Sequence, residues 1–179
     1  MKLAQEGQLI TTPDGAIKDP YVLEFLGLKE DHKYTENELE QAIIDNLEDF
    51  LLELGKGFTF VGRQKRFTAG EEHFYVDLVF YHRFLKCFIL VDLKIGKITY
   101  KDIGQMQMYV NRYDKEYKSL EENKTIGLIL CKVKDDIVLQ YTLPDNQQIF
   151  TKEYKLYLPN KAELKQYLDQ HLDIEDNLE

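Results

Sequence analysis

The sequence predicts an α/β fold in which a mixed β-sheet is flanked by helices. Three short runs of aromatic and β-branched residues follow one another between residues 58 and 94. Segments with apolar residues at helical spacing lie before and after these runs. The chain has 179 residues, of which 44% are apolar and 31% are charged. This composition suits one domain and is too polar for a membrane-embedded protein.

Turn signals and few core-forming residues at 1–20 predict an N-terminal arm or linker. We expect one domain over residues 21–172 and an acidic tail at 173–179. Cys87 and Cys131 each lie inside an apolar run, so we expect two buried thiols rather than a disulfide. No long apolar stretch is present, and a reducing, cytoplasmic setting is the expectation.

The first helix is predicted for residues 36–54, because Thr35 and Glu38 fit a capping box and Gly55 provides a stop. An antiparallel meander of three strands is expected next, at 58–67, 74–81 and 87–94. A second helix is expected at 101–117, then strands at 125–131, 137–143 and 149–158, and a short last helix from residue 160.

Carboxylates interrupt two of the apolar strands. Asp77 lies in a run that is apolar on both strand faces, so its carboxylate is expected to be buried or to face a pocket. Asp92 and Lys94 are two residues apart and therefore project from one face of the next strand. If the two strands pair, Asp77 comes to lie opposite Asp92. Adjacent carboxylates repel or recruit a cation, and hard oxygen ligands indicate Mg²⁺ or Mn²⁺.

A third acid comes from the first helix. Glu40 falls within the arc of apolar residues that faces the core, whereas Glu36, also near this arc, is explained as a first-turn acid by the helix dipole. Each acid alone is better explained by structure, such as a buried turn bond or a carboxylate that reaches water. Together, three acids and Lys94 in apolar contexts favour a catalytic site.

These residues resemble the PD-(D/E)XK nuclease superfamily, and more closely its YhcG-type members, bacterial proteins with such a nuclease as their C-terminal domain. The resemblance runs from residue 19 to about residue 168 and includes Glu40, Asp77 in YVDLVFY and Asp92 in DLKIG. Gln105 and Tyr109 match the Q-x-x-x-Y element of RecB-like nucleases. Val76 stands where the superfamily's naming proline would be.

The resemblance implies a restriction-endonuclease-like core and a metal-dependent deoxyribonuclease. Asp77, Asp92 and the Leu93 carbonyl would bind a divalent cation, with Glu40 bound directly or through water. Lys94 would orient the attacking water and stabilise charge on the phosphate. On the second helix, Gln105 and Tyr109 would hold the phosphate backbone or the lysine, or else pack as a core tyrosine and a solvated glutamine.

Charge is unevenly distributed along the chain. The formal net charge is -9, yet residues 56–101 contain nine basic and four acidic residues. A locally basic sheet in an acidic body suits a protein that touches DNA on one face only. Lys65 and Arg66, in the strand before Asp77, are the expected phosphate contacts. The alternative is that some of these basic residues are only exposed charges on strand edges and have no role in binding DNA.

The sequence therefore predicts a nuclease that uses Mg²⁺ or Mn²⁺ and acts on DNA. The rival from another class is a catalytically weak nucleic-acid-binding or assembly module that retains a vestigial site. An RNase would use the same residues. The resemblance also implies an N-terminal nucleic-acid-binding domain in a longer protein, and cutting both strands with one site per chain would favour a homodimer.

Overall fold

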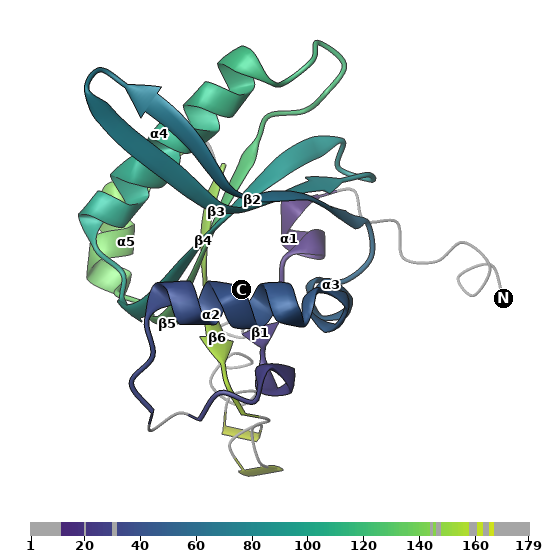
Figure 1. Ribbon diagram of the computed structural model, residues 1–179, viewed down its shortest axis with the longest axis vertical. Helices are drawn as coiled ribbons and strands as arrows, with labels where there is room; N and C mark the ends of the chain where they lie inside the picture. The colour runs from purple at the N-terminus through teal and green to yellow at the C-terminus, as the bar shows by residue number, and fades with distance from the viewer. Residues whose placement is uncertain are drawn as a thin grey trace, which may run out of the picture.

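A computed structural model describes residues 12–19, 21–29, 32–143, 145, 148–157, 161–162 and 165–166. They form one six-stranded mixed sheet with helices on both faces (Figure 1). The strands are β1 (Tyr21–Val22), β2 (Phe58–Ala69), β3 (Glu72–His82), β4 (Cys87–Lys97), β5 (Ile126–Val133) and β6 (Ile149–Lys155). The helices are α1 (Pro13–Ala16), α2 (Glu36–Asp45), α3 (Leu47–Leu54), α4 (Tyr100–Glu116) and α5 (Asp136–Thr142), with a 3-10 turn, η2, at Glu24–Leu26.

The sheet has an antiparallel half and a parallel half, in the order β1-β6-β5-β4-β3-β2. The meander β2-β3-β4 is antiparallel, as the sequence predicted, and β4, β5, β6 and β1 run parallel to one another. A parallel connection needs a crossover, and α4 provides it between β4 and β5. The predicted mixed sheet flanked by helices is therefore confirmed.

Two hydrophobic cores lie on opposite faces of the sheet. Leu39 and Ile43 of α2 pack with Ile89, Val91 and Leu93 of β4 on one face. On the other face, residues of α4 pack on alternate strand positions; these include Met106, Val110, Leu90 and Ile129. Figure 1 shows α2 and α3 crossing one face while α4 runs along the other. The central strands are consequently buried on both sides.

The predicted strand at 137–143 is wrong, because this segment is helix α5. Asp135 caps it by accepting a hydrogen bond from the Val138 backbone N–H. Ile137 and Tyr141, the residues that favoured a strand, are 71% and 80% exposed, and α5 buries none of its residues. Residue type alone therefore misled the assignment, since these side chains find no sheet surface to pack on.

The predicted first helix is divided at Asn46, which separates α2 from α3. The capping box at Thr35 and Glu38 is present, and Gly55 follows the last helical residue. Cys87 and Cys131 are buried free thiols, as expected. No helix in the described part of the chain is long and apolar enough to cross a membrane.

The N-terminal segment contributes to the core over its described residues. Ala16 and Ile17 are buried in the core that α2 covers, and β1 adds a short parallel strand beside β6. Residues 1–11 and 173–179, parts of the expected arm and tail, lie outside the described residues, as does most of the expected last helix. The domain boundaries at residues 20 and 172 stay predictions.

The sheet divides where β3 leaves β4. Their pairing extends from His82–Cys87 only to Leu78–Val91, whereas β2 and β3 stay paired as far as Ala69–Glu72. Beyond Leu78 the β2–β3 hairpin continues alongside α4, to which Phe67 is joined by ring contact with Tyr109 (Figure 1). We call this division the fork.

The close approach of α4 to β5 offers a test of this packing. A Cβ at Gly127 would lie 2.5 Å from Met106 Cγ and 2.7 Å from Met106 Sδ. Because Met106 is fully buried, Gly127→Ala should lower the free energy of unfolding by about 1–3 kcal/mol. Gly96→Ala is the matched control, because a Cβ there meets no atom within 4 Å. Urea denaturation measures both, and equal stability of the two variants would contradict this packing.

Candidate active site

Asp77 and Asp92 occupy the first positions beyond the last β3–β4 pair, one on each side of the fork. The backbone N–H of Leu93, which has no β3 carbonyl opposite it, donates to Asp77 Oδ2 at 2.8 Å. Asp92 is 3% exposed and interacts with the Asp77 carboxyl group. The fork thus brings the two carboxylates together because a side chain replaces the missing strand pairing.

Lys94 lies among carboxylates from three elements. Its ammonium Nζ is 3.1 Å from Asp92 Oδ2, on the same strand. It is also 3.6 Å from Asp102 Oδ1 at the start of α4 and 3.7 Å from Glu36 Oε2 at the start of α2. Glu36 therefore reaches the site as well as the helix N-terminus. The lysine is held between both helical layers at the open end of the fork.

Glu40 enters the site from α2 and is 3% exposed. Arg63 Nε lies 3.0 Å from Glu40 Oε1. The Gln64 amide donates to Glu40 Oε2 and also to Asp77 Oδ1, the latter at 3.1 Å. Two consecutive residues of β2 therefore contact the helix acid, and one of them, Gln64, links it to the strand acid.

Burial raises the pKa of Asp92 to about 8; the Asp77 carboxylate adds to this rise and the Lys94 ammonium opposes it. Burial also raises the pKa of Glu40, while the hydrogen bond from Gln64 opposes the rise. For Lys94, burial lowers the pKa, but the Asp92 carboxylate and its neighbours outweigh burial, so the pKa lies above its ordinary value. Lys94 therefore stays charged.

Gln105 and Tyr109 lie on α4 and contact each other. The Gln105 amide donates to the Tyr109 hydroxyl, which in turn donates to the Tyr75 carbonyl of β3 at 2.9 Å. Tyr109 is fully buried, and its ring meets Phe67 of β2 edge-on. The pair joins α4 to the backbone of the β2–β3 hairpin, two residues from Asp77.

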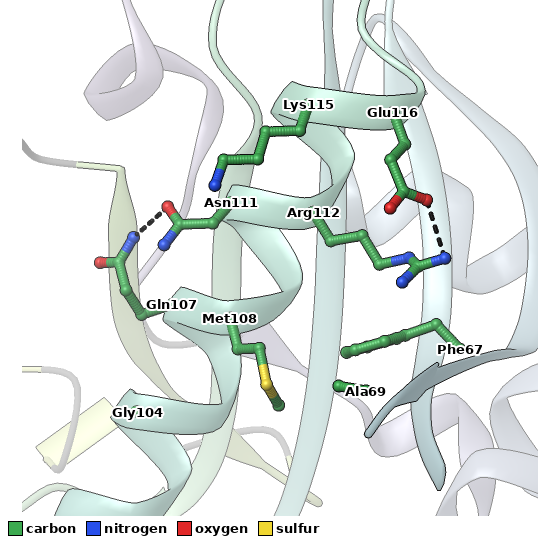
Figure 2. Close-up of a pocket in the computed structure, with 9 residues that line it drawn as sticks. All are labelled: Phe67, Ala69, Gly104, Gln107, Met108, Asn111, Arg112, Lys115 and Glu116. Carbon is green, nitrogen blue, oxygen red and sulfur yellow. Dashed lines mark hydrogen bonds and ion pairs between the residues drawn. The ribbon is translucent and has the colours of Figure 1, made fainter. Parts of the chain in front are cut away.

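Lys65 and Arg66 are exposed on β2. Arg66 contacts the His73 ring across the hairpin at 3.0 Å. Nearby, an open groove of about 460 Å³ lies between the hairpin and the outer side of α4 (Figure 2). Arg112 lies over the Phe67 ring there and pairs with Glu116. None of the acids of the fork lines this groove.

The carboxylate oxygens of the fork suit a hard divalent cation, whereas the charged Lys94 is not a ligand. Glu40 Oε1 and Asp92 Oδ2 are buried, and each faces a cation: Arg63 Nε lies 3.0 Å from the first and Lys94 Nζ 3.1 Å from the second. In that same part of the chain, no three His, Cys, Asp or Glu side chains are grouped closely enough to hold a metal ion. The Gln64 amide lies between Glu40 and Asp77, so Glu40 is separated from Asp77 by one intervening side chain.

Comparison with known proteins decides the family. A model of the YhcG PDDEXK nuclease domain matches residues 14–169. The chain belongs to this family. It is also 48% identical over 154 residues to the protein named "Putative nuclease YhcG" from Escherichia coli (strain K12). The match covers 85% of this chain and 40% of that protein, so the chain spans less than half the length of its curated relative.

Three solved structures are similar at low identity. A repair endonuclease from Pyrococcus abyssi has a TM-score of 0.46 at 19% identity, covering 74% of this chain and 50% of that one. An EndoMS–dsDNA complex has a TM-score of 0.48 at 15% identity, covering 74% and 51%. EndoMS in apo form has a TM-score of 0.43 at 17% identity, covering 73% and 49%.

The sequence reasoning missed Arg63 and Gln64 as residues of this site. One signal could have pointed to them: residues 63–66 are four consecutive polar residues inside a strand that otherwise alternates. Regular alternation places polar side chains on one face of a strand. A continuous polar run therefore indicates an irregular strand whose polar side chains contact other polar groups on both faces. These polar groups include the acid pair Glu40 and Asp77.

The raised pKa of Asp92 predicts a pH-dependent stability in metal-free protein. A carboxyl group with a raised folded-state pKa stabilises fully below its unfolded pKa near 4 and loses that contribution as the pH rises through about 8. Asp92→Asn removes this loss. The variant should gain at least about 1 kcal/mol over the wild type between pH 5 and pH 8. Denaturant unfolding in EDTA measures it, and a pH-independent difference would contradict the raised pKa of Asp92.

Proposed function

We propose that this chain is a divalent-metal-dependent nuclease that hydrolyses DNA phosphodiester bonds. The observation that carries the proposal is the meeting of Asp77, Asp92 and Lys94 in the fork, with Glu40 close behind. Burying two acids beside a cation costs stability. The chain belongs to a nuclease family, and a catalytic use of the cluster explains this cost.

Asp77, Asp92 and the Leu93 carbonyl would hold Mg²⁺ or Mn²⁺, with Glu40 bound directly or through water. The meeting of the buried carboxylates of Asp92 and Glu40 with Asp77 supports this assignment, because clustered carboxylate oxygens suit a hard divalent cation. When bound, the ion supplies Lewis-acid polarisation of the scissile phosphate and lowers the pKa of a water. The Leu93 N–H holds Asp77 by one oxygen and leaves lone pairs of the carboxylate available.

Lys94 supplies a positive charge beside the acids of the proposed site. Three carboxylates keep its ammonium protonated and limit its freedom, so it acts as a positioned donor rather than as a general base. Its three N–H groups can orient the attacking water and stabilise negative charge that develops on the phosphate. Gln105 and Tyr109 support this centre, because they tie α4 to the hairpin that carries Asp77.

The substrate side of the proposal rests on charge. Lys65 and Arg66 are exposed on the hairpin that leads into the fork, where they can contact phosphates. The net charge of -9 gives the isolated chain weak and salt-sensitive DNA affinity. In a longer protein of this family, a further nucleic-acid-binding domain would supply affinity, and a homodimer would place two sites on the two strands.

The first functional test is DNA cleavage by purified protein with Mg²⁺ or Mn²⁺. Plasmid or linear DNA should be cut, EDTA should stop the reaction, and Asp92→Ala should abolish it. Lys94→Ala should lower the rate at least about 100-fold, since charge on the phosphate loses its positioned donor. Gel-based rates measure this, with Lys124→Ala, an exposed lysine before β5, as the matched control.

Cleavage by both site variants at the wild-type rate would overturn the proposal. A folded wild type that neither cuts DNA nor binds Mg²⁺ or Mn²⁺ in calorimetry would favour the rival function, a binding or assembly module with a vestigial site. Metal binding that disappears in Asp77→Asn would instead support the nuclease.

Phosphate contacts on the hairpin predict a change in salt dependence. The double variant Lys65→Ala, Arg66→Ala should weaken DNA binding regardless of sequence. It should also reduce the slope of log affinity against log salt by about 2, since each phosphate contact contributes about 0.9. Fluorescence anisotropy at several salt concentrations measures the slope, with Lys124→Ala as control. An unchanged slope would place the DNA elsewhere on the protein.

A further inference from the structure

Gln64 occupies a special place in β2. In the β2–β3 register Arg63 pairs with Leu78 and Lys65 with Val76, so Gln64 lies opposite Asp77. Its side-chain nitrogen donates to both Asp77 Oδ1 and Glu40 Oε2. One neutral amide therefore bridges two carboxylates that come from different layers of the fold.

The backbone at Gln64 is unusual for a strand. Its φ of +45° lies in the left-handed region, which residues with a side chain enter at a cost. In a regular strand Arg63 and Gln64 would point to opposite faces, yet both reach Glu40. The left-handed turn of the backbone is what directs the amide to the acids. The strained backbone at Gln64 is therefore explained by the contacts of its side chain with the acids, and not by strand pairing.

Electrostatics explains why an amide suits this position. Glu40 and Asp77 repel each other, and Asp77 already contributes to raising the pKa of Glu40. An amide can donate to both carboxylates without adding charge, whereas a lysine there would form an ion pair that competes with a bound cation. The two acids are thus held close together while their charge stays available.

We propose that Gln64 is a positioning residue that holds Glu40 beside Asp77 and so preorganises the fork for a divalent cation. The bridge is a property of the metal-free chain, and its effect on cation binding rests on the proposed function. Residues that orient metal ligands in this way typically contribute 10- to 100-fold to affinity.

The decisive variant is Gln64→Asn. Asparagine keeps an amide and enters the left-handed region readily, so the backbone at this position is maintained or relieved. Its side chain is one methylene shorter and cannot span both carboxylates. We expect the dissociation constant for Mn²⁺, measured calorimetrically without DNA, to rise about 10-fold. The KM for DNA should not change, because no phosphate contact is lost.

A second variant tests the bridge without any metal. Gln64→Glu cannot donate when ionised and adds a third carboxylate, so in EDTA its unfolding temperature should fall by about 5 °C. Gln107→Asn is the matched control for the shortened amide, since Gln107 donates to Asn111 on the outer side of α4. This control should leave Mn²⁺ affinity unchanged.

The outcomes separate the two proposals. A wild type that binds Mn²⁺, together with Gln64→Asn protein of the same affinity, overturns the role of Gln64 and leaves the nuclease proposal intact. A wild type that binds no Mn²⁺ removes the metal-dependent function and with it the preorganising role. In that case a Gln64→Glu protein that melts at the wild-type temperature in EDTA overturns the bridge too, whereas a lowered temperature supports the bridge alone.

Discussion

The hydrogen bond from the Leu93 N–H to Asp77 Oδ2, 2.8 Å long, is the interaction on which the rest of the site depends. A buried strand cannot leave its neighbour without satisfying the backbone groups that it exposes. At the fork, β3 leaves β4 after the pair Leu78–Val91, and the Asp77 carboxylate takes the place of the lost strand carbonyl. One side chain therefore ends the pairing and places an acid beside Asp92.

The charges around the fork do not balance. Five carboxyl groups and two cations lie in contact there, a formal excess of three negative charges when every group is ionised: Glu36, Glu40, Asp77, Asp92 and Asp102 against Arg63 and Lys94. Such repulsion in a partly buried place is unfavourable: burial raises the pKa values of Asp92 and Glu40, and the Asp77 carboxylate adds to both rises. The two hydrophobic cores that enclose the central strands offset this unfavourable repulsion. A divalent cation would relieve the excess that Lys94 and Arg63 leave.

Much of the fold was predictable, because it depends on local patterns. The capping box at Thr35 and the apolar meander determine α2 and the strands β2 to β4, and period-two spacing places Asp92 and Lys94 on one face. The segment 137–143 was not predictable from residue type, since its helix depends on the Asp135 cap and on the absence of a sheet surface beside it. The bridge by Gln64 was hidden for a related reason. A left-handed residue inside a strand is set by its tertiary neighbours, and a sequence pattern assumes regular alternation.

The Q-x-x-x-Y element has a structural role in this fold. The sequence left two interpretations of Gln105 and Tyr109 open: contact with the phosphate or the lysine, or packing as a core tyrosine and a solvated glutamine. In the fold, the tyrosine hydroxyl is buried and donates to the Tyr75 carbonyl, so the element determines where the β2–β3 hairpin lies relative to α4. That hairpin carries Asp77 on its inner strand and Gln64 on its outer strand. A change at Tyr109 would therefore act on the distance between Asp77 and Asp92 before it acted on any phosphate. The proposed cation site therefore depends on the position of the hairpin as well as on the identity of the acids.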